Sequence, residues 1–510
     1  MDDLLTVAVA GTARAGVRSE LPDGPIGQAI AHLDSAAPER WLLLAAGAYA
    51  IRRRAGVRPL MQPDEPVRAD DETWSVAAER IALPLGELLS WQSSELLLEA
   101  LERLQRARLL IPPALLPVVL DAGARNNAIR PTLLGVIGRR GRWLARQNSD
   151  WSWATMPDAD DVVANADTIW QEGVHAERLD VLRLVRSSDP ARGLALLAST
   201  WTRERAAFRA EAIELLGVNL SMEDQSFLEA ALDDRATTVR ERAEALLVRI
   251  PGSRPAREAE AQAEPLIGTR LGFQIVVRPP DDVEQATALI KAFSRVAPSH
   301  WTAHLGKRPS DLVKVIARDR DWGFSVLTGW TQATLTFEDE EWAAALFSVW
   351  LASPPPLGKA ADAYARSFEV TVNGYLIGLL QVMRPADAER AVAASPDPLR
   401  MPAILRAAGR AWGAVFTDRY LRSLRDSVER TFRQAAVDSQ AIHAWTASIQ
   451  SATVAIPPGS IQDAIDLLHQ VDEIELPGEA KFHGNYWKES LRRCSETLQM
   501  RQRIDEEIRA

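Results

Sequence analysis

The chain has 510 residues, of which 47% are hydrophobic and 25% are charged, and its net charge is −10. This length predicts two or three domains or one extended repeat array, and the composition argues against wholesale disorder. The acidic balance disfavours duplex-DNA binding, and the single cysteine, Cys494, excludes both an internal disulfide and a multi-cysteine metal site.

The N-terminus begins with acidic residues, whereas a secretory signal begins with basic ones. The longest apolar run, residues 41–51, falls well short of the roughly 20 residues that cross a bilayer. A chain with one cysteine also fits a reducing compartment. We therefore expect a soluble, cytoplasmic protein without a membrane segment.

Apolar residues recur at helical spacing along nearly the whole chain, for example in residues 93–111 and 420–437. The segments between these runs contain Pro, Gly, Asp or Ser, which commonly end or begin helices. Strand-like alternation occurs in residues 271–277 and 368–375, and either segment could instead be the edge of a helix. The pattern predicts an all-α fold.

A glycine-rich and arginine-rich segment lies at residues 135–143. Backbone amides beside arginines can hold a phosphate, but a dinucleotide site would need these glycines between a strand and a helix. The favoured interpretation is a helix end followed by a tight turn. Its side chains are candidate contacts for a partner: Arg139, Arg140, Arg142 and Trp143.

The clearest internal repeat aligns Arg178, Arg209 and Arg240 at a spacing of 31 residues, since 209 − 178 = 31 and 240 − 209 = 31. Apolar residues recur at matching positions after each arginine, and a second helical segment lies between successive copies. Each helix pair has an apolar stripe too wide to bury alone, so neighbouring pairs must stack. The pattern resembles HEAT-type repeats, and we predict an α-solenoid of HEAT-like helical pairs.

The three repeated arginines are interpreted as a structural ladder that fixes the register between units. We expect each to reach the acidic turn of a neighbouring unit, at residues such as Asp189 or Asp233. Acidic residues alternate with the arginines, which is typical of a solvated face with paired charges and not of a track for phosphates.

A polar, alanine- and glutamate-rich segment at residues 254–268 is predicted to be a linker, either flexible or a short solvated helix. The rest of the chain is tryptophan-rich, with Trp322 and Trp330 eight residues apart and so on one helix face. Most tryptophans are expected to fill gaps between helices, and the alternative is a partner groove anchored by Trp322 and Trp330. The predicted parts are residues 1–150, 151–253, 254–268 and 269–510.

The sequence contains no recognisable catalytic motif. It has neither a phosphate-binding P-loop nor a G-x-S-x-G nucleophile elbow, and its paired carboxylates are typical of caps and turns. His300 and His304 are spaced to share a helix face, but the glutamate of a zincin motif is absent and no third ligand lies nearby. We therefore predict no catalytic residue, no cofactor and no metal site.

Three parts of the chain carry a resemblance to a known family: residues 135–151, the repeat region at residues 177–201 and 220–253, and the C-terminal segment ETLQMRQRIDEEI. The sequence resembles a bacterial family of uncharacterised proteins that carry a domain of unknown function. Its members are commonly encoded beside MoxR-type AAA+ ATPases, von Willebrand A-domain proteins and SWIM zinc-finger proteins. The resemblance implies an adaptor or substrate-recognition subunit of an ATPase-linked module.

The predicted function is thus a non-enzymatic protein-interaction scaffold whose partner is a MoxR-type AAA+ ATPase or a von Willebrand A-domain protein. The alternatives are a nucleic-acid-binding HEAT-like solenoid, which the acidic charge disfavours, and an enzyme with an unrecognised site.

Overall fold

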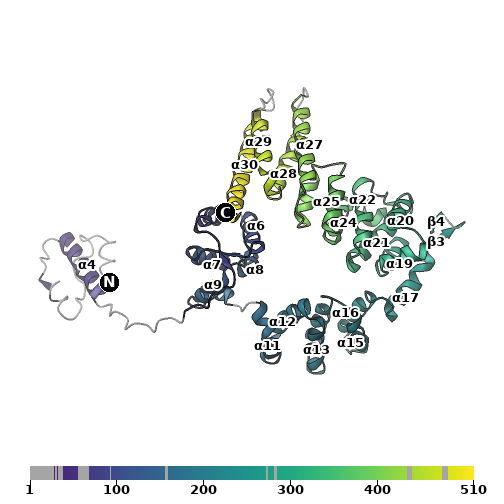
Figure 1. Ribbon diagram of the computed structural model, residues 1–510, viewed down its shortest axis with the longest axis horizontal. Coiled ribbons are helices and arrows are strands. Elements are labelled where there is room, and N and C mark those ends of the chain that lie inside the picture. Colours follow the sequence, from purple (N-terminus) through teal and green to yellow (C-terminus); the bar gives the residue numbers. More distant parts are fainter. Residues whose placement is uncertain are drawn as a thin grey trace. The chain divides into compact units, whose positions relative to one another are not determined.

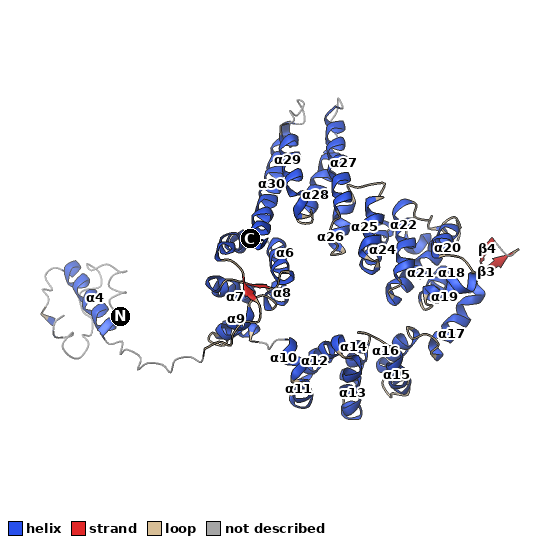
Figure 2. Ribbon diagram, viewed as in Figure 1, coloured by secondary structure: helices blue, strands red, loops and turns tan. Residues whose placement is uncertain are grey.

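The computed structural model describes residues 28, 31–32, 38–55, 68–91, 94–155, 159–271, 274–280, 284–433, 439–473 and 481–509. The chain forms two compact units, Met1–Asp71 and Glu72–Ala510, so the predicted N-terminal region of residues 1–150 divides at Asp71 (Figure 1). The described residues are mostly helical, as Figure 2 shows, which confirms the predicted all-α class. In the first unit, the structure describes helix α4 (Pro38–Ala55).

The few strands among the described residues form two short pairs. β1 (Ser75–Val76) runs parallel to β2 (Leu109–Leu110), and β3 (Ile267–Arg270) pairs antiparallel with β4 (Gln274–Val277). Of the two segments with strand-like alternation, residues 271–277 thus contain β4, whereas residues 368–375 lie within helix α24 (Phe368–Val382). Phe368 and Val372 are four residues apart and pack on the core as one face of α24, whereas Val370 between them is exposed.

The second unit begins with short helices that pack around their own apolar core. They are α5 (Ala82–Trp91), α6 (Ser94–Arg106), α7 (Leu116–Arg125), α8 (Arg130–Leu134) and α9 (Gly138–Ala145). Met500 and Ile504 from the C-terminal helix α30 (Lys481–Arg509) are part of the same apolar core. The first and last segments of this unit therefore fold against each other.

An ion-pair network reinforces this contact between α30 and α6. The guanidinium of Arg501 donates two hydrogen bonds to the Glu99 carboxylate, at 2.6 and 2.7 Å, and a third to the Thr453 carbonyl at 2.7 Å. Arg103 also donates to Glu99, at 2.6 Å. Only 4% of the Arg501 side chain is exposed. Removing either partner of a buried ion pair would leave an uncompensated charge and destabilise the fold.

Residues 159–250 form a consecutive run of helices with one apolar core of their own. The helices are α10 (Ala159–Ala164), α11 (Ala166–Glu172), α12 (His175–Ser188), α13 (Pro190–Thr200), α14 (Ala206–Leu216), α15 (Gln225–Ala231) and α16 (Thr237–Val248). α12, α14 and α16 pack side by side in that order, while α13 packs on α12 and α15 packs on α16.

The segment predicted as a linker is a packed helix. α17 (Arg254–Ala263) starts at Ser253, whose hydroxyl accepts the Ala256 N–H, and it continues into a short 3-10 turn, η7 (Glu264–Leu266). The alanines at 256, 259 and 263 are buried, so the helix has an apolar face and is not solvated all round. α17 packs on both α16 and the following helix, α18 (Gln285–Ser294).

The remaining helices share one large apolar core that extends from Ala259 to Leu498. They are α19 (Pro298–Leu305), α20 (Pro309–Ile316), α21 (Gly323–Phe337), α22 (Glu340–Ala352), α23 (Ala361–Tyr364), α24, α25 (Pro385–Ala393), α26 (Met401–Ala407), α27 (Ala414–Arg433), α28 (Ser439–Thr453), α29 (Ile461–Asp472) and α30. Seven tryptophan side chains are fully buried in the described part of the chain, six of them in this core. Among the described residues, none of the helices is both long and apolar enough to cross a membrane.

Candidate functional site

Two of the three repeated arginines, Arg178 and Arg209, form ion pairs between neighbouring elements, but with different partners from those expected. Arg178 reaches Glu204 at 2.5 Å, and Arg209 reaches Asp234 with two bonds of 2.8 Å. Asp189 instead caps α13 by accepting the Arg192 N–H, and Asp233 is exposed. The partner of Arg209 is therefore the second aspartate of the turn, because Asp234 also accepts the Ala236 N–H and is held facing inward.

The third arginine of the series is bound differently. Arg240 donates to the Asp234 and Arg235 carbonyls at 2.8 and 3.2 Å and to the Thr237 hydroxyl at 3.0 Å. The two carbonyls lie in the turn that precedes α16, and Thr237 is the first residue of that helix. Arg240 therefore stabilises the start of α16, and the bonds that it makes do not reach the following helix.

We predict that the Arg209–Asp234 pair makes stability depend on pH. The hydrogen bond from Arg209 holds the pKa of the Asp234 carboxyl below its usual value, although burial acts in the opposite direction. A lowered folded-state pKa stabilises the fold above the unfolded pKa, which is about 3.9, and this contribution is lost as the pH falls. The thermal midpoint of Asp234→Asn should thus lie below that of the native chain at pH 6, and the gap should narrow towards pH 3. A constant gap would contradict this role.

A buried ion pair that the sequence did not reveal lies between these helices. Arg186 of α12 contacts Asp224 at 2.8 and 3.0 Å, and each side chain is only 1% exposed. The same guanidinium donates to four backbone carbonyls, those of Pro190, Leu216, Val218 and Asn219. Arg186 falls outside the 31-residue pattern, and the only sequence signal for Asp224 is its place three residues after the capping residue Ser221.

Gly193 makes room for this arginine. A Cβ atom at position 193 would lie 2.6 Å from the Arg186 Cδ, closer than side-chain atoms approach each other. The glycine within α13 thus allows the arginine to pass between two helices.

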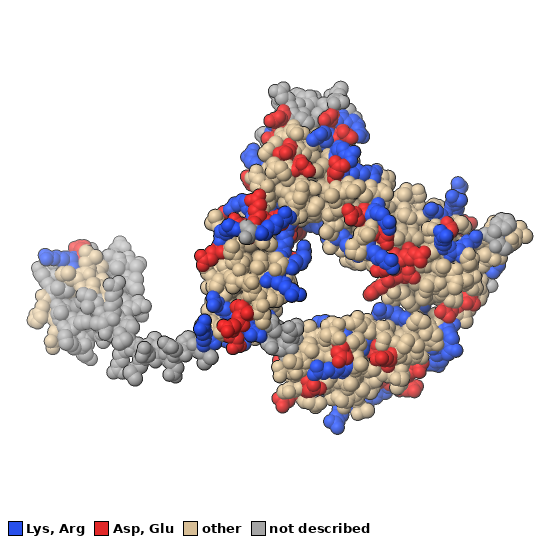
Figure 3. All heavy atoms as spheres, in the orientation of Figure 1, with Lys and Arg blue, Asp and Glu red and all other residues tan. Residues whose placement is uncertain are grey.

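The exposed surface of the side-by-side helices is acidic and internally paired. We call it the α12–α14–α16 face and define it by His175, Glu211, Glu214, Glu241, Arg242 and Glu244. Polar contacts cross it from helix to helix: His175 Nε2 lies 3.1 Å from the Glu211 carboxylate, and Arg242 forms an ion pair with Glu214 at 3.2 Å. Arg295, which follows α18, extends the series by pairing with Glu244. Figure 3 shows acidic and basic side chains interspersed over the visible surface of the second unit.

The arginine-rich turn at residues 135–143 binds an anion from within the chain. The Glu72 carboxylate accepts the N–H groups of Arg139 and Arg140, each at 2.8 Å, at the start of α9. Gly138 has a φ of +64°, and a Cβ there would lie 2.5 Å from the Glu72 carboxylate. The amides considered for phosphate therefore already hold a carboxylate.

The candidate partner-binding side chains of this segment differ in their solvent exposure. Arg142 is buried and donates to the Gly138 and Leu134 carbonyls at 3.2 and 2.9 Å, so its bonds are structural. Arg140 is exposed, whereas Arg139 and Trp143 are half-buried. Of the four candidate residues, Arg140 is the most accessible.

The two tryptophans proposed as groove anchors are not equivalent. Trp330 is fully buried and packs on Trp342 and Phe293, with ring centroids 4.9 and 6.1 Å apart, so it belongs to the core and cannot reach a partner at the surface. Trp322 is half-buried at the start of α21. Trp322 precedes α21 as its N-cap residue, whereas Trp330 lies within the helix and points into the core.

Cys494 also belongs to the core of the second unit. Its side chain is buried, and burial raises the pKa of the thiol to about 11, although a hydrogen bond with Thr453 acts against this. Because the thiolate is the nucleophilic form, the raised pKa makes this cysteine a poor nucleophile near neutral pH.

A cleft of about 290 Å³ lies between α29 and α30, and His469, Asp472, Arg492, Ser495 and Glu496 are among the residues that line it. This volume is at the lower limit of small-molecule sites. His469 Nε2 lies 3.4 Å from the Ser495 hydroxyl, at the outer limit of a hydrogen bond. The cleft therefore offers polar groups but little room for a substrate.

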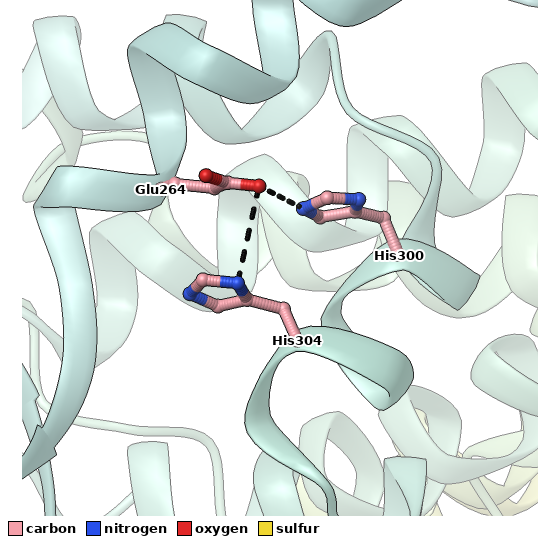
Figure 4. Close-up of side chains that lie close together, drawn as sticks. All are labelled: Glu264, His300 and His304. Carbon is pink, nitrogen blue, oxygen red and sulfur yellow. Dashed lines mark ion pairs between the residues drawn. The ribbon is translucent and has the colours of Figure 1, made fainter. Parts of the chain in front are cut away.

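One cluster of ligand-type side chains forms between distant parts of the sequence. Glu264, from η7, lies against His300 and His304, from α19 (Figure 4). The Glu264 Oε1 atom is 3.2 Å from His300 Nε2 and 3.9 Å from His304 Nδ1. The histidine pair was visible in the sequence, but the third residue was not, because it lies within the predicted linker.

Comparisons with known proteins place the chain in a family without assigning it a reaction. Neither the curated proteins nor the solved structures include a match to the sequence. A family model described as a family of unknown function, DUF5691, matches residues 3–508. Since this match covers nearly the whole chain, the protein belongs to the DUF5691 family.

Proposed function

We propose that this protein is a non-enzymatic interaction scaffold or adaptor of the cytoplasm, and that residues 159–250 form a HEAT-like helical array. The observation that carries the proposal is the α12–α14–α16 face, an exposed surface that three neighbouring helices share. Stacked helical pairs characteristically bind other proteins on such extended surfaces. The Arg186–Asp224 and Arg209–Asp234 ion pairs are buried beneath this face. They hold successive helices together and so fix the positions of the side chains on the face.

The charge of this face favours a basic protein partner. Glu211, Glu214, Glu241 and Glu244 outnumber Arg242, and the sequence as a whole has a net charge of −10. Complementary charge guides association and disfavours wrong partners. On the resemblance described above, we propose a MoxR-type AAA+ ATPase or a von Willebrand A-domain protein as the partner.

The surface gives less support to a nucleic-acid-binding array. Phosphate backbones bind where lysine and arginine side chains form a continuous track. On the α12–α14–α16 face the basic side chain Arg242 pairs with Glu214, so its charge is already compensated.

Co-elution of purified proteins tests the proposed function. The full chain is mixed with a MoxR-type ATPase, and separately with a von Willebrand A-domain protein, each taken from the same genome as the chain. We expect one of them to elute with the chain by size-exclusion chromatography at about 150 mM salt, where the Debye length is about 8 Å and only close charge pairs persist. Labelled duplex DNA and single-stranded RNA serve as competing ligands. Co-elution with a nucleic acid and with neither protein would contradict the proposal.

A further inference from the structure

Two helical segments present pairs of metal-binding side chains to each other. Glu260 and Glu264 are four residues apart on α17 and η7, and His300 and His304 are four residues apart on α19. This spacing places the two members of each pair on the same side of their helical segment. The imidazole rings are nearly parallel, with centroids 5.7 Å apart and an angle of 14° between their planes.

The atoms that could bind a metal ion point towards a common centre. One ligand atom each from Glu264, His300 and His304 lies within 4.8 Å of the other two. In a tetrahedral zinc site, with metal–ligand bonds of about 2.1 Å, neighbouring ligand atoms are about 3.4 Å apart. The observed distances from Glu264 Oε1, 3.2 Å to His300 and 3.9 Å to His304, bracket this value.

Two further observations at His300 suit a metal ligand. Its Nε2 atom is buried and has no hydrogen-bond partner among the described residues, although Glu264 lies nearby. Buried polar atoms almost always have a hydrogen-bond partner, and a bound ion is one way of satisfying this nitrogen. The other ring nitrogen, Nδ1, faces the Glu260 carboxylate at 3.6 Å. A histidine that binds metal through one nitrogen commonly presents the other to a carboxylate, which orients the ring.

The residues around the cluster hold the histidines in place and leave a path for an ion from solvent. Trp301, between the two histidines, is fully buried and packs edge-on against the His300 ring, with centroids 5.2 Å apart, which anchors α19. The Glu264 side chain is 41% exposed, so an ion can enter from solvent. Three protein ligands also leave a position that water can complete.

We propose that Glu264, His300 and His304 bind a divalent transition-metal ion, Zn²⁺ in the first instance, with Glu260 orienting His300. Two imidazoles and one carboxylate suit Zn²⁺ and are a poor set for Mg²⁺ or Ca²⁺, which prefer oxygen ligands. The ion joins η7, which follows α17, to α19. Because Ala259 and Ala263 of α17 already pack in the large C-terminal core, the ion would reinforce that contact. This inference is independent of the proposed scaffold function.

A zinc titration of the full chain tests the site. The protein is purified without a histidine tag, dialysed against a chelator and titrated with Zn²⁺ in competition with a chromophoric chelator. We expect one Zn²⁺ per chain, a higher thermal midpoint when zinc is bound, and no competition from Mg²⁺ or Ca²⁺. Co²⁺ should bind in place of Zn²⁺ and give the visible absorption of a four-coordinate ion.

Matched variants identify the ligands. The double variant His300→Ala/His304→Ala should lose the bound ion, and Glu264→Gln should weaken binding by at least about tenfold. Glu260→Gln should weaken it by about tenfold through His300. His175→Gln is the control, because His175 also lies against a glutamate, at 3.1 Å, but belongs to no described three-residue cluster. The proposal is overturned if the native chain binds no more zinc than the double variant, or if Glu264→Gln binds as the native chain does while melting at the same temperature without metal.

Discussion

Arg186→Ala is expected to lower the free energy of opening of α12–α16 by about 3–5 kcal/mol, the usual cost of removing one partner from a buried ion pair. The Asp224 carboxylate would remain 1% exposed without its cation, and four backbone carbonyls would lose a donor. Arg186→Lys should recover only part of this loss, because an ammonium cannot reproduce the fork of the guanidinium. Hydrogen exchange of the amides in residues 166–250 measures the effect region by region.

The control for this variant is Arg240→Ala. Arg240 is half-buried and bonds to the turn before α16 and to Thr237 at the start of that helix, so its loss should cost only about 1 kcal/mol. Equal effects of the two substitutions on hydrogen exchange would show that the buried pair has no special role in holding these helices together.

Arg501→Ala is expected to release the C-terminal end of α30 from α6 at a cost of about 3 kcal/mol. The substitution removes three hydrogen bonds at a side chain that is 4% exposed, two to Glu99 and one to the Thr453 carbonyl. Glu99 keeps Arg103 as a partner, which limits the loss. Because Met500 and Ile504 lie in the same core as the helices of residues 82–145, limited proteolysis should cut near the C-terminus of the variant first.

Arg503→Ala, two residues further along the same helix, is the matched control. Arg503 pairs with Glu87 at 3.1 Å, but the two side chains are 46% and 35% exposed, and solvent-accessible pairs contribute at most about 1 kcal/mol. If both variants resisted proteolysis as the native chain does, the contact between α6 and α30 would not depend on the Arg501 network.

The helical class was predictable because apolar spacing is a local property of the sequence. The 31-residue spacing also located the arginines that form ion pairs, at Arg178 and Arg209, but it could not identify their partners. Asp233 and Asp234 are adjacent, and the turn geometry that points one outward and the other towards Arg209 is not encoded by residue type. Arg186 was missed because a single arginine in a helix gives no sign that it is buried.

The segment at residues 254–268 has the apolar spacing of a packed helix, although it is also rich in charged residues. Its alanines at 256, 259 and 263 have helical spacing and form the buried face of α17, yet the surrounding glutamates and arginines made the segment look solvated. Because residues 254–268 were predicted to be a linker, Glu264 was not among the candidate metal ligands. The cluster with His300 and His304 depends on packing between residues 36 or more apart, which helical periodicity does not predict.

The central claim is that the α12–α14–α16 face binds a protein partner, and calorimetric titration of the partner found by co-elution tests it most directly. The variant Glu211→Lys/Glu241→Lys reverses two charges on this face. Glu223→Lys/Glu229→Lys reverses two exposed charges on the other layer, at α15 and the turn before it. We predict that the first variant weakens binding at least about tenfold, which is 1.4 kcal/mol, while the second binds as the native chain does. Equal affinities for the native chain and both variants, all with the same thermal midpoint, would contradict the claim.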